Sequence, residues 1–227
     1  EMEIWHGFLF LRFLPGPQPA VARLMQPFDA DFSTYRAEAL LPTEMPGGQT
    51  ATLPVNWKSV RDVDNEGYHV AMAHPALQDL YGRTYRDIVY PGGISHSHGE
   101  FGETGGRRWS GRNYLKLTPR PEHLPPRLRR SWTYYGLFPN TVFAFTPEGA
   151  QYYHDIPLTK DETRLAGRMY RQPEENRVTR AARYLAARID RATSVEDRQL
   201  SIWSNESMKS TAFDDFHLSD LEYGVRA

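Results

Sequence analysis

Short apolar segments separated by turn residues fill much of the second half of the chain. They cover residues 132–138, 141–146, 150–157 and 162–171, and turns such as Pro139-Asn140 lie between them. Alternating apolar and polar positions bounded by turn residues predict β-strands. Because the connecting turns are short, we predict that consecutive strands pair as an antiparallel meander.

The rest of the chain before Pro173 shows weaker patterns, interrupted by Gly and Pro. Apolar runs bounded by turn residues indicate strands or short helices, and long Gly-rich stretches indicate loops. Near the N-terminus we predict a strand at 4–13 running into a turn at Pro15-Gly16-Pro17, then a short helix at 20–28 and a connecting strand at 35–41. A loop at 42–48 follows, and residues 51–55 lead into the next helix. Further along we predict a long loop at 82–106 and a strand at 107–117.

Beyond Pro173 the apolar period changes to three and four residues, from Val178 through Leu185 to Ile189. This period predicts a helix, and a second helix is predicted at 195–208. A meander followed by terminal helices indicates an α+β domain in which helices pack on one face of an antiparallel sheet. With 227 residues, one domain spanning 1–227 is the simplest organisation.

Composition adds limits on partners. Hydrophobic residues make up 40%, charged residues 24%, and the formal net charge is −1. These values are typical of a soluble globular protein and give no general attraction to nucleic acid or to a membrane. Residues 107–130 hold eight Lys or Arg and one acid, Glu122. We interpret this run as the solvated face of paired strands, with a docking patch for an acidic partner as the alternative.

The ends of the chain carry no targeting signal, so a cytoplasmic setting is expected. The chain begins at Glu1 and enters a strand pattern almost at once, which predicts that it is the C-terminal part of a longer protein. Cys is absent. Disulfides, zinc fingers and thiolate-bound iron–sulfur clusters are therefore excluded within these residues.

Two histidines five residues apart, His69 and His74, are the strongest chemical signal. The preceding residues have a helical pattern, and positions i and i+5 of an ideal helix point about 140° apart. The two imidazoles converge only if the helix ends or bulges between them. Pro75 disfavours helical geometry at His74, so we expect the helix to end there and His74 to turn back toward His69.

Two imidazoles alone do not determine which metal binds, so a third ligand must come from elsewhere in the chain. A carboxylate would complete a two-His-one-carboxylate triad, which suits non-haem Fe(II). We rank Asp197 first, because it follows Glu196 at the head of the second predicted helix. The full set of candidates is Asp155, Asp161, Asp190, Asp197, Asp214 and Asp215.

Other histidines and the aromatic residues give weaker signals. His96 and His98 would share one face of an extended segment, but their Gly- and Ser-rich setting favours a mobile surface loop over chelation. His6, His123, His154 and His217 are single, and we interpret each as structural or surface. At least half of the aromatic residues that alternate along the strands should fill the core, and the rest could line a pocket. These residues are Trp132, Tyr134, Tyr135, Phe138, Phe143 and Phe145.

The stretch around the two histidines contains a distinctive set of residues: Asn56, Trp57, Lys58, Glu66, Tyr68, His69, His74 and Pro75. This set resembles the signature of the catalytic domain of Rieske non-haem iron oxygenases, the α subunits of ring-hydroxylating oxygenases. Further similarity lies in residues 5–10, Phe138-Pro139-Asn140, Glu196-Asp197 and the tail at 218–225. The resemblance implies a helix-grip (START-like) architecture.

By this resemblance His69, His74 and Asp197 would be the iron ligands, and Glu66 would relay electrons from a Rieske cluster in a neighbouring subunit. The family often has Glu-Asn where this chain has Arg61-Asp62. Because the cluster needs two Cys, the 2Fe-2S Rieske cluster is expected on a domain outside these residues.

The resemblance also implies cofactors and partners. The metal would be Fe(II), and the substrates would be O2 and a small aromatic or quaternary ammonium compound. Electrons would come from NADH through a reductase and sometimes a ferredoxin, and the protein would form a homo-oligomer, a trimer in the family. Two alternatives from the residues alone stay open. One is a small-ligand-binding helix-grip protein without chemistry, and the other is a zinc hydrolase that uses the same three ligands.

Overall fold

An eight-stranded antiparallel sheet forms the centre of the fold. The computed structural model describes residues 1–14, 16, 19–44, 50–212, 215 and 217–226. The strand order is β3-β10-β9-β8-β7-β6-β5, and β4 pairs with β10 beside β3. The strands are β3 (Leu41–Thr43), β4 (Thr50–Leu53), β5 (Arg86–Tyr90), β6 (Ile94–Glu100), β7 (Ser131–Leu137), β8 (Thr141–Thr146), β9 (Gly149–Thr159) and β10 (Glu162–Arg171).

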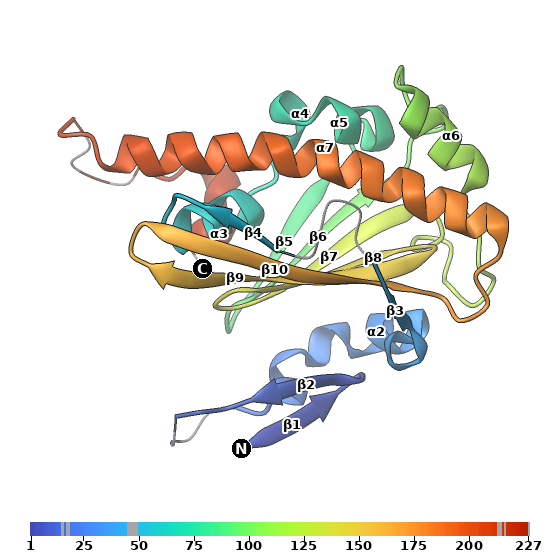
Figure 1. Ribbon diagram of the computed structural model, residues 1–227, viewed down its shortest axis with the longest axis horizontal. Coiled ribbons are helices and arrows are strands. Elements are labelled where there is room, and N and C mark those ends of the chain that lie inside the picture. The colour runs from blue at the N-terminus through green and yellow to red at the C-terminus, as the bar shows by residue number, and fades with distance from the viewer. Residues whose placement is uncertain (15, 17–18, 45–49, 213–214, 216, 227) are drawn as a thin grey trace.

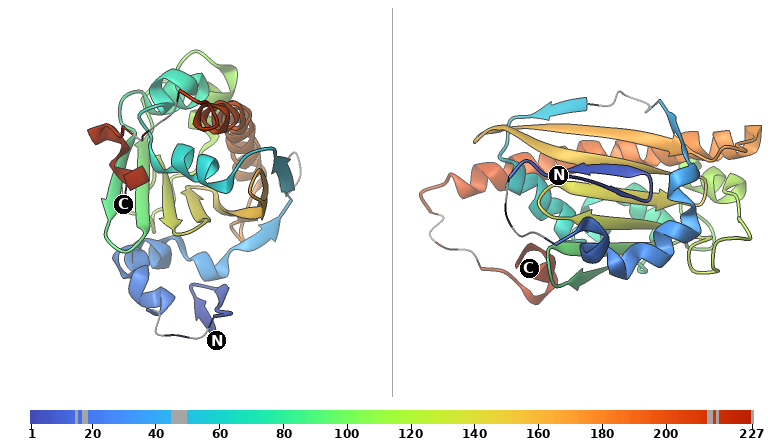
Figure 2. Two further views of the ribbon diagram at one scale, coloured as in Figure 1. Left: turned by 90° about the vertical axis from the view of Figure 1, so that its left-hand side faces the viewer. Right: turned by 90° about the horizontal axis from the view of Figure 1, so that it is seen from below.

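Helices cover one face of this sheet, and the N-terminal segment covers the other (Figures 1 and 2). The long helix α7 lies across the first face, with the shorter helices beside it. The helices on this face are α3 (Trp57–Asn65), α4 (Val70–Ala73), α5 (Pro75–Tyr81), α6 (Trp109–Leu117) and α7 (Arg177–Met208). None of the described helices combines the length and apolarity needed to cross a membrane.

The N-terminal layer consists of a two-stranded hairpin and short helices. These are β1 (Met2–Trp5), β2 (Phe8–Leu11), α1 (Val21–Leu24), a 3₁₀ turn (Gln26–Phe28), α2 (Asp29–Tyr35) and a second 3₁₀ turn (Ala37–Ala39). The chain ends in a 3₁₀ turn (Asp220–Glu222) and α8 (Tyr223–Arg226).

Each face of the sheet has its own apolar core. On the helical face, Leu80, Tyr114, Trp132 and Leu185 belong to one buried cluster. Burial of such side chains is worth about 1.5–3 kcal/mol each, which holds α5, α6 and α7 against the sheet. On the other face, residues of the N-terminal layer pack on β7, β8 and β9. The metal-site candidates lie on the helical face.

The predicted α+β class and the antiparallel meander from β7 to β10 are confirmed. The predicted loop at 82–106 is wrong, because β5 and β6 occupy much of it. Ladder hydrogen bonds to β7 stabilise β6 despite its small polar residues. The predicted strand at 107–117 is also wrong, because α6 lies there. The basic run at 107–130 therefore lies on a helix and its following loop, not on paired strands.

The two predicted C-terminal helices are one continuous helix, α7, since residues 190–194, four of them polar, interrupt the apolar pattern without any Gly or Pro. The predicted strand at 4–13 is a hairpin that turns at His6 and Gly7, both with positive φ. The predicted strand at 35–41 is wrong: helical turns fill it up to Ala39. The predicted loop at 42–48 begins inside β3, and its part at 45–49 lies outside the described residues, as do Pro15 and Pro17 of the predicted turn.

Candidate metal centre

Two breaks in the helical segment bring His69 and His74 together. Helix α3 is capped by the Asn56 side chain, which accepts a hydrogen bond from the Lys58 amide, and it ends at Asn65. Glu66 is extended, and the next residue is Gly67. A Cβ on Gly67 would lie 2.0 Å from Tyr85 Cε1, so only glycine allows the chain to pass here.

The four-residue helix α4 lies between the two histidines. His69 precedes it and His74 follows it, in a non-helical conformation. The predicted end of a helix at His74 is confirmed, because His74 is non-helical and follows α4. The expectation of one uninterrupted helix before it is wrong: the chain breaks at Glu66, and Pro75 opens the next helix, α5, where its missing N–H costs nothing. The imidazoles converge nonetheless: their Nε2 atoms are 3.0 Å apart and their rings cross at 81°.

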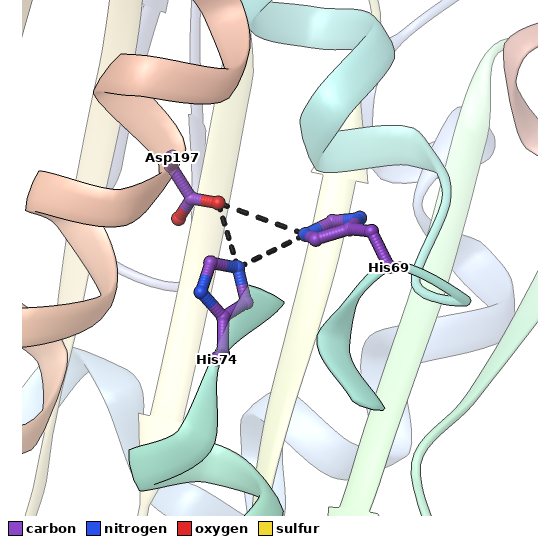
Figure 3. A group of neighbouring side chains, drawn as sticks. All are labelled: His69, His74 and Asp197. Atoms are coloured by element: carbon purple, nitrogen blue, oxygen red, sulfur yellow. Dashed lines mark hydrogen bonds and ion pairs between the residues drawn. The ribbon is translucent and has the colours of Figure 1, made fainter. Parts of the chain in front are cut away.

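Asp197 approaches the same point from α7 (Figure 3). Its Oδ1 atom lies 2.8 Å from His74 Nε2 and 3.6 Å from His69 Nε2. Among the described residues, these three side chains are the group whose ligand atoms lie close enough together to hold a metal ion, all within 4.8 Å. Asp197 lies in the middle of α7, not at a helix head, so the dipole argument that ranked it first was wrong.

Two more carboxylates orient the imidazoles from behind. Glu66 Oε1 is 2.5 Å from His69 Nδ1, and Glu196 Oε2 is 2.9 Å from His74 Nδ1. A carboxylate at Nδ1 keeps the hydrogen there and turns the Nε2 lone pair toward the metal position. The sequence singled out Glu196 only as the neighbour of Asp197. Its contact with His74 required knowing how α7 crosses α5.

The three side chains influence one another's charge. Burial opposes the charged form of His69, but hydrogen bonds to Asp197 and Glu66 outweigh it and raise the pKa of His69 to about 10. Burial likewise opposes charging of His74, yet Asp197 and Glu196 raise the pKa of His74 above its usual value. Burial favours protonated Asp197, but both imidazoles lower the pKa of Asp197. Without a metal the site holds protons in its place.

The donor set fits a divalent metal ion. Asp197 Oδ1 is buried, and it faces the Nε2 atoms of His74 and His69 at 2.8 Å and 3.6 Å. Two nitrogens and one carboxylate oxygen on one side of a point form a facial arrangement that suits Fe(II) and also accommodates Zn²⁺.

The other sequence candidates lie elsewhere. Asp155 and Asp190 line the adjoining pocket without joining the group, and Asp161 pairs with Lys209 at the surface. Asp214 lies outside the described residues, and Asp215 is not in the group.

His96 and His98 are buried in β6, so their predicted place on a mobile surface loop is wrong. His96 stacks on Tyr135, and His98 contacts Thr133. Two of the single histidines have ordinary polar partners: His6 pairs with Asp29, and His154 contacts Thr141.

A pocket of about 410 Å³ opens beside the metal-site residues, between α3, α7 and the sheet. Tyr134 lines it, whereas Phe138 is 69% exposed. The expectation that at least half of the six alternating aromatic residues fill the core is confirmed by the burial of Trp132, Tyr135, Phe143 and Phe145.

Comparison with protein families gives one match. The model of the ring hydroxylating alpha subunit (catalytic domain) matches residues 32–227, which is most of the chain. A comparison with curated protein sequences gives no match.

Solved structures with the same fold include a quaternary ammonium Rieske monooxygenase, with 17% identity, a TM-score of 0.73, and coverage of 99% of this chain and 59% of that one. Naphthalene 1,2-dioxygenase with indole bound has 15% identity and a TM-score of 0.63, with 93% and 53% covered. The enzyme from Rhodococcus sp. bound to indole has 12% identity and a TM-score of 0.63, with 90% and 54% covered. The chain thus spans little more than half the length of these structures.

Proposed function

Because the chain belongs to the family of ring-hydroxylating α-subunit catalytic domains, we propose that it is the oxygenase domain of a Rieske-type non-haem iron enzyme. In this proposal residues 1–227 form one catalytic domain of a longer, cytoplasmic protein. The observation that carries the proposal is the convergence of His69, His74 and Asp197 beside a pocket.

His69, His74 and Asp197 would hold the metal, which we propose to be Fe(II). Bound there, ferrous iron supplies the redox chemistry by which O2 is activated toward an organic substrate. The chain's own residues contribute positioning: Glu66 and Glu196 hold the Nδ1 protons of the two imidazoles, so that both Nε2 atoms face the metal. The adjoining pocket holds the substrate, which would be hydroxylated or demethylated.

Electrons must come from outside these residues. The chain contains no Cys, so a 2Fe-2S Rieske cluster needs another domain or subunit, supplied from NADH by a reductase and, in some systems, a ferredoxin. We propose that Glu66 is the relay residue. Its carboxylate contacts His69, and the side chain is 13% exposed, so it connects the metal position with the neighbouring surface. This role implies a homo-oligomer, such as a trimer, in which the next subunit's cluster docks nearby.

The first experiment measures metal content after anaerobic reconstitution with Fe(II) or Zn²⁺. We expect about one iron per chain, and O2 consumption only when electrons are supplied. A zinc hydrolase would instead need zinc and no reductant, and a simple binding protein would retain neither metal. Failure to retain iron would reject the oxygenase proposal.

A variant tests the ligand set. Asp197→Ala should abolish iron retention and leave the helical circular dichroism signal unchanged, because the side chain is partly exposed on a long helix. Asp190→Ala on the same helix is the matched control and should keep its iron. Unchanged iron binding in Asp197→Ala would show that another carboxylate is the ligand.

A further inference from the structure

A buried guanidinium lies between two carboxylates in the pocket. Arg61 Nη1 donates to Asp64 Oδ2 at 3.2 Å and lies 3.5 Å from Asp155 Oδ2. Arg61 Nη2 donates to Asn65 Oδ1 at 3.0 Å. All of these side chains except that of Asn65 line the pocket. The three charged groups form what we call the Arg61 cluster: Arg61, Asp64 and Asp155.

The charges in this cluster do not balance. One guanidinium faces two carboxylates, and Asp190 adds a third acid to the pocket lining. The other lining arginines, Arg191 and Arg198, are exposed, where solvent screens their charge. Buried charges are costly unless they are paired. With both of its carboxylates ionised, the Arg61 cluster carries a net charge of −1, which one further positive charge would neutralise.

The two acids of the cluster differ in access. Asp155 is fully buried, and neither of its oxygens accepts a hydrogen bond. It lies against Arg61 and offsets its charge. Asp64 keeps 23% of its side chain exposed and is the acid that a ligand can reach. Burial and the charges of Asp155 and Asp197 raise the pKa of Asp64, as expected of a carboxylate short of a cation near the metal position.

The backbone leaves space for this arrangement. Gly136 of β7 lies under the guanidinium: a Cβ there would be 3.5 Å from Arg61 Nη2 and 2.2 Å from Ser95 Oγ. Arg61 itself is 7% exposed. It is fixed by three polar contacts, so it cannot easily swing away to release both acids.

The hydrogen-bonding pattern distinguishes between kinds of cation. A quaternary ammonium has no N–H and is held by several aromatic faces. Three tyrosines line the pocket, Tyr85, Tyr134 and Tyr153, but the one at Asp64 presents its hydroxyl: Tyr153 donates to Asp64 Oδ1 at 3.4 Å. Each Asp64 oxygen accepts one hydrogen bond, from Arg61 or from Tyr153, so each keeps a further lone pair for an N–H donor, and a protonated amine supplies such a donor.

Resting on the proposed function for the site as a whole, we propose that the substrate carries a protonated amine with at least one N–H, bound by Asp64, while the Arg61–Asp155 pair positions that carboxylate.

A matched set of ligands tests this with iron-loaded protein comprising residues 1–227, under anaerobic conditions. The probes are N,N-dimethylbenzylammonium, its neutral carbon isostere isobutylbenzene, and benzyltrimethylammonium, which lacks N–H. Dissociation constants come from calorimetry or thermal shift. We expect the protonated amine to bind at least about tenfold more tightly than either other probe, the usual effect of a hydrogen bond to a charged group.

Two variants localise the effect. Asp64→Asn should remove at least about tenfold of the amine's affinity and leave isobutylbenzene binding unchanged. Asp62→Asn makes the same charge change on the same helix, at a residue that is not among the described pocket-lining residues, and should have no effect. The comparison of probes on the unaltered protein stands even if Asp64→Asn fails to fold.

Equal binding of the quaternary and protonated probes, or no amine binding at all, would overturn the inference. Iron content is measured on the same samples. Retained iron without amine preference rejects this inference alone, whereas absence of iron from the unaltered protein rejects the proposed function instead.

Discussion

The proton content of the metal-free site leads to a quantitative prediction about metal binding. Hydrogen bonds to Asp197 and Glu66 raise the pKa of His69 to about 10. At pH 7, about three units below this pKa, His69 is protonated, and a metal ion must displace that proton. Removing the proton costs about 4 kcal/mol of binding free energy.

The sign follows from the raised pKa. In the metal-free fold, protonated His69 stabilises the structure fully below the ordinary histidine value of 6.5. This contribution is lost as the pH rises toward about 10. The affinity of the site for a metal ion changes in the opposite direction and increases as the pH rises. The association constant should rise about tenfold per pH unit between pH 7 and 9 for each proton released.

The assay is a titration with Co(II), an air-stable spectroscopic substitute, against a competing chelator at several pH values. Calorimetry in two buffers of different ionisation enthalpy counts the released protons. Glu66→Gln keeps all three proposed ligands and removes one of the carboxylates that raise the pKa of His69, so its pH dependence should level off at a lower pH. An association constant that does not change between pH 7 and 9 would refute the reasoning.

Three further predictions concern stability. Gly67→Ala forces a Cβ against Tyr85 and should lower the free energy of unfolding by about 1–3 kcal/mol and reduce the metal content. Gly102→Ala, whose Cβ would have an ordinary 3.6 Å contact, is the control. Equal melting temperatures of the two variants would contradict the packing argument. Burial raises the pKa of Glu148 to about 7, so the fold loses stability as the pH rises from about 4.5 to 7. In urea unfolding Glu148→Gln should remove that loss, and an unchanged pH profile would count against it. Burial lowers the pKa of His96 to about 4, so the free energy of unfolding falls as the pH drops from 6.5 toward 4. In the same assay His96→Phe should remove this loss of stability at low pH. If the variant is as acid-sensitive as the unaltered protein, His96 does not cause the loss.

The sequence predicted the parts of the fold whose pattern is local. Strands β7 to β10 are apolar or alternate apolar with polar residues, and turn residues such as Pro139-Asn140 and Asp161 separate them, so each carries its own signal. Strand β6 does not: its residues Ser95 to Gly99 are Ser, His and Gly, and pairing with β5 and β7 makes them a strand. The sequence predicts a strand where α6 lies, because this segment has few apolar residues. Among them, Tyr114 is the one that is buried.

The site shows the same division. Convergence of His69 and His74 was predictable from five-residue spacing and a proline, although the break that matters is at Gly67, where Tyr85 occupies the space of a side chain. The contact of Glu196 with His74 was not predictable, because the two residues are 122 positions apart and meet only where α7 crosses the α4–α5 junction. No local pattern encodes that crossing.

The distance along the chain between these groups also has a kinetic consequence. His69 and His74 come from the segment between strands β4 and β5, and Asp197 from the helix after β10. The three groups therefore meet only when strands β5 to β10, which lie between them in the chain, are in place. Contacts of such long sequence separation form late in folding. Chelation of a metal would thus report the completed structure, and a partly folded chain would be protected from trapping an ion in an incomplete coordination sphere.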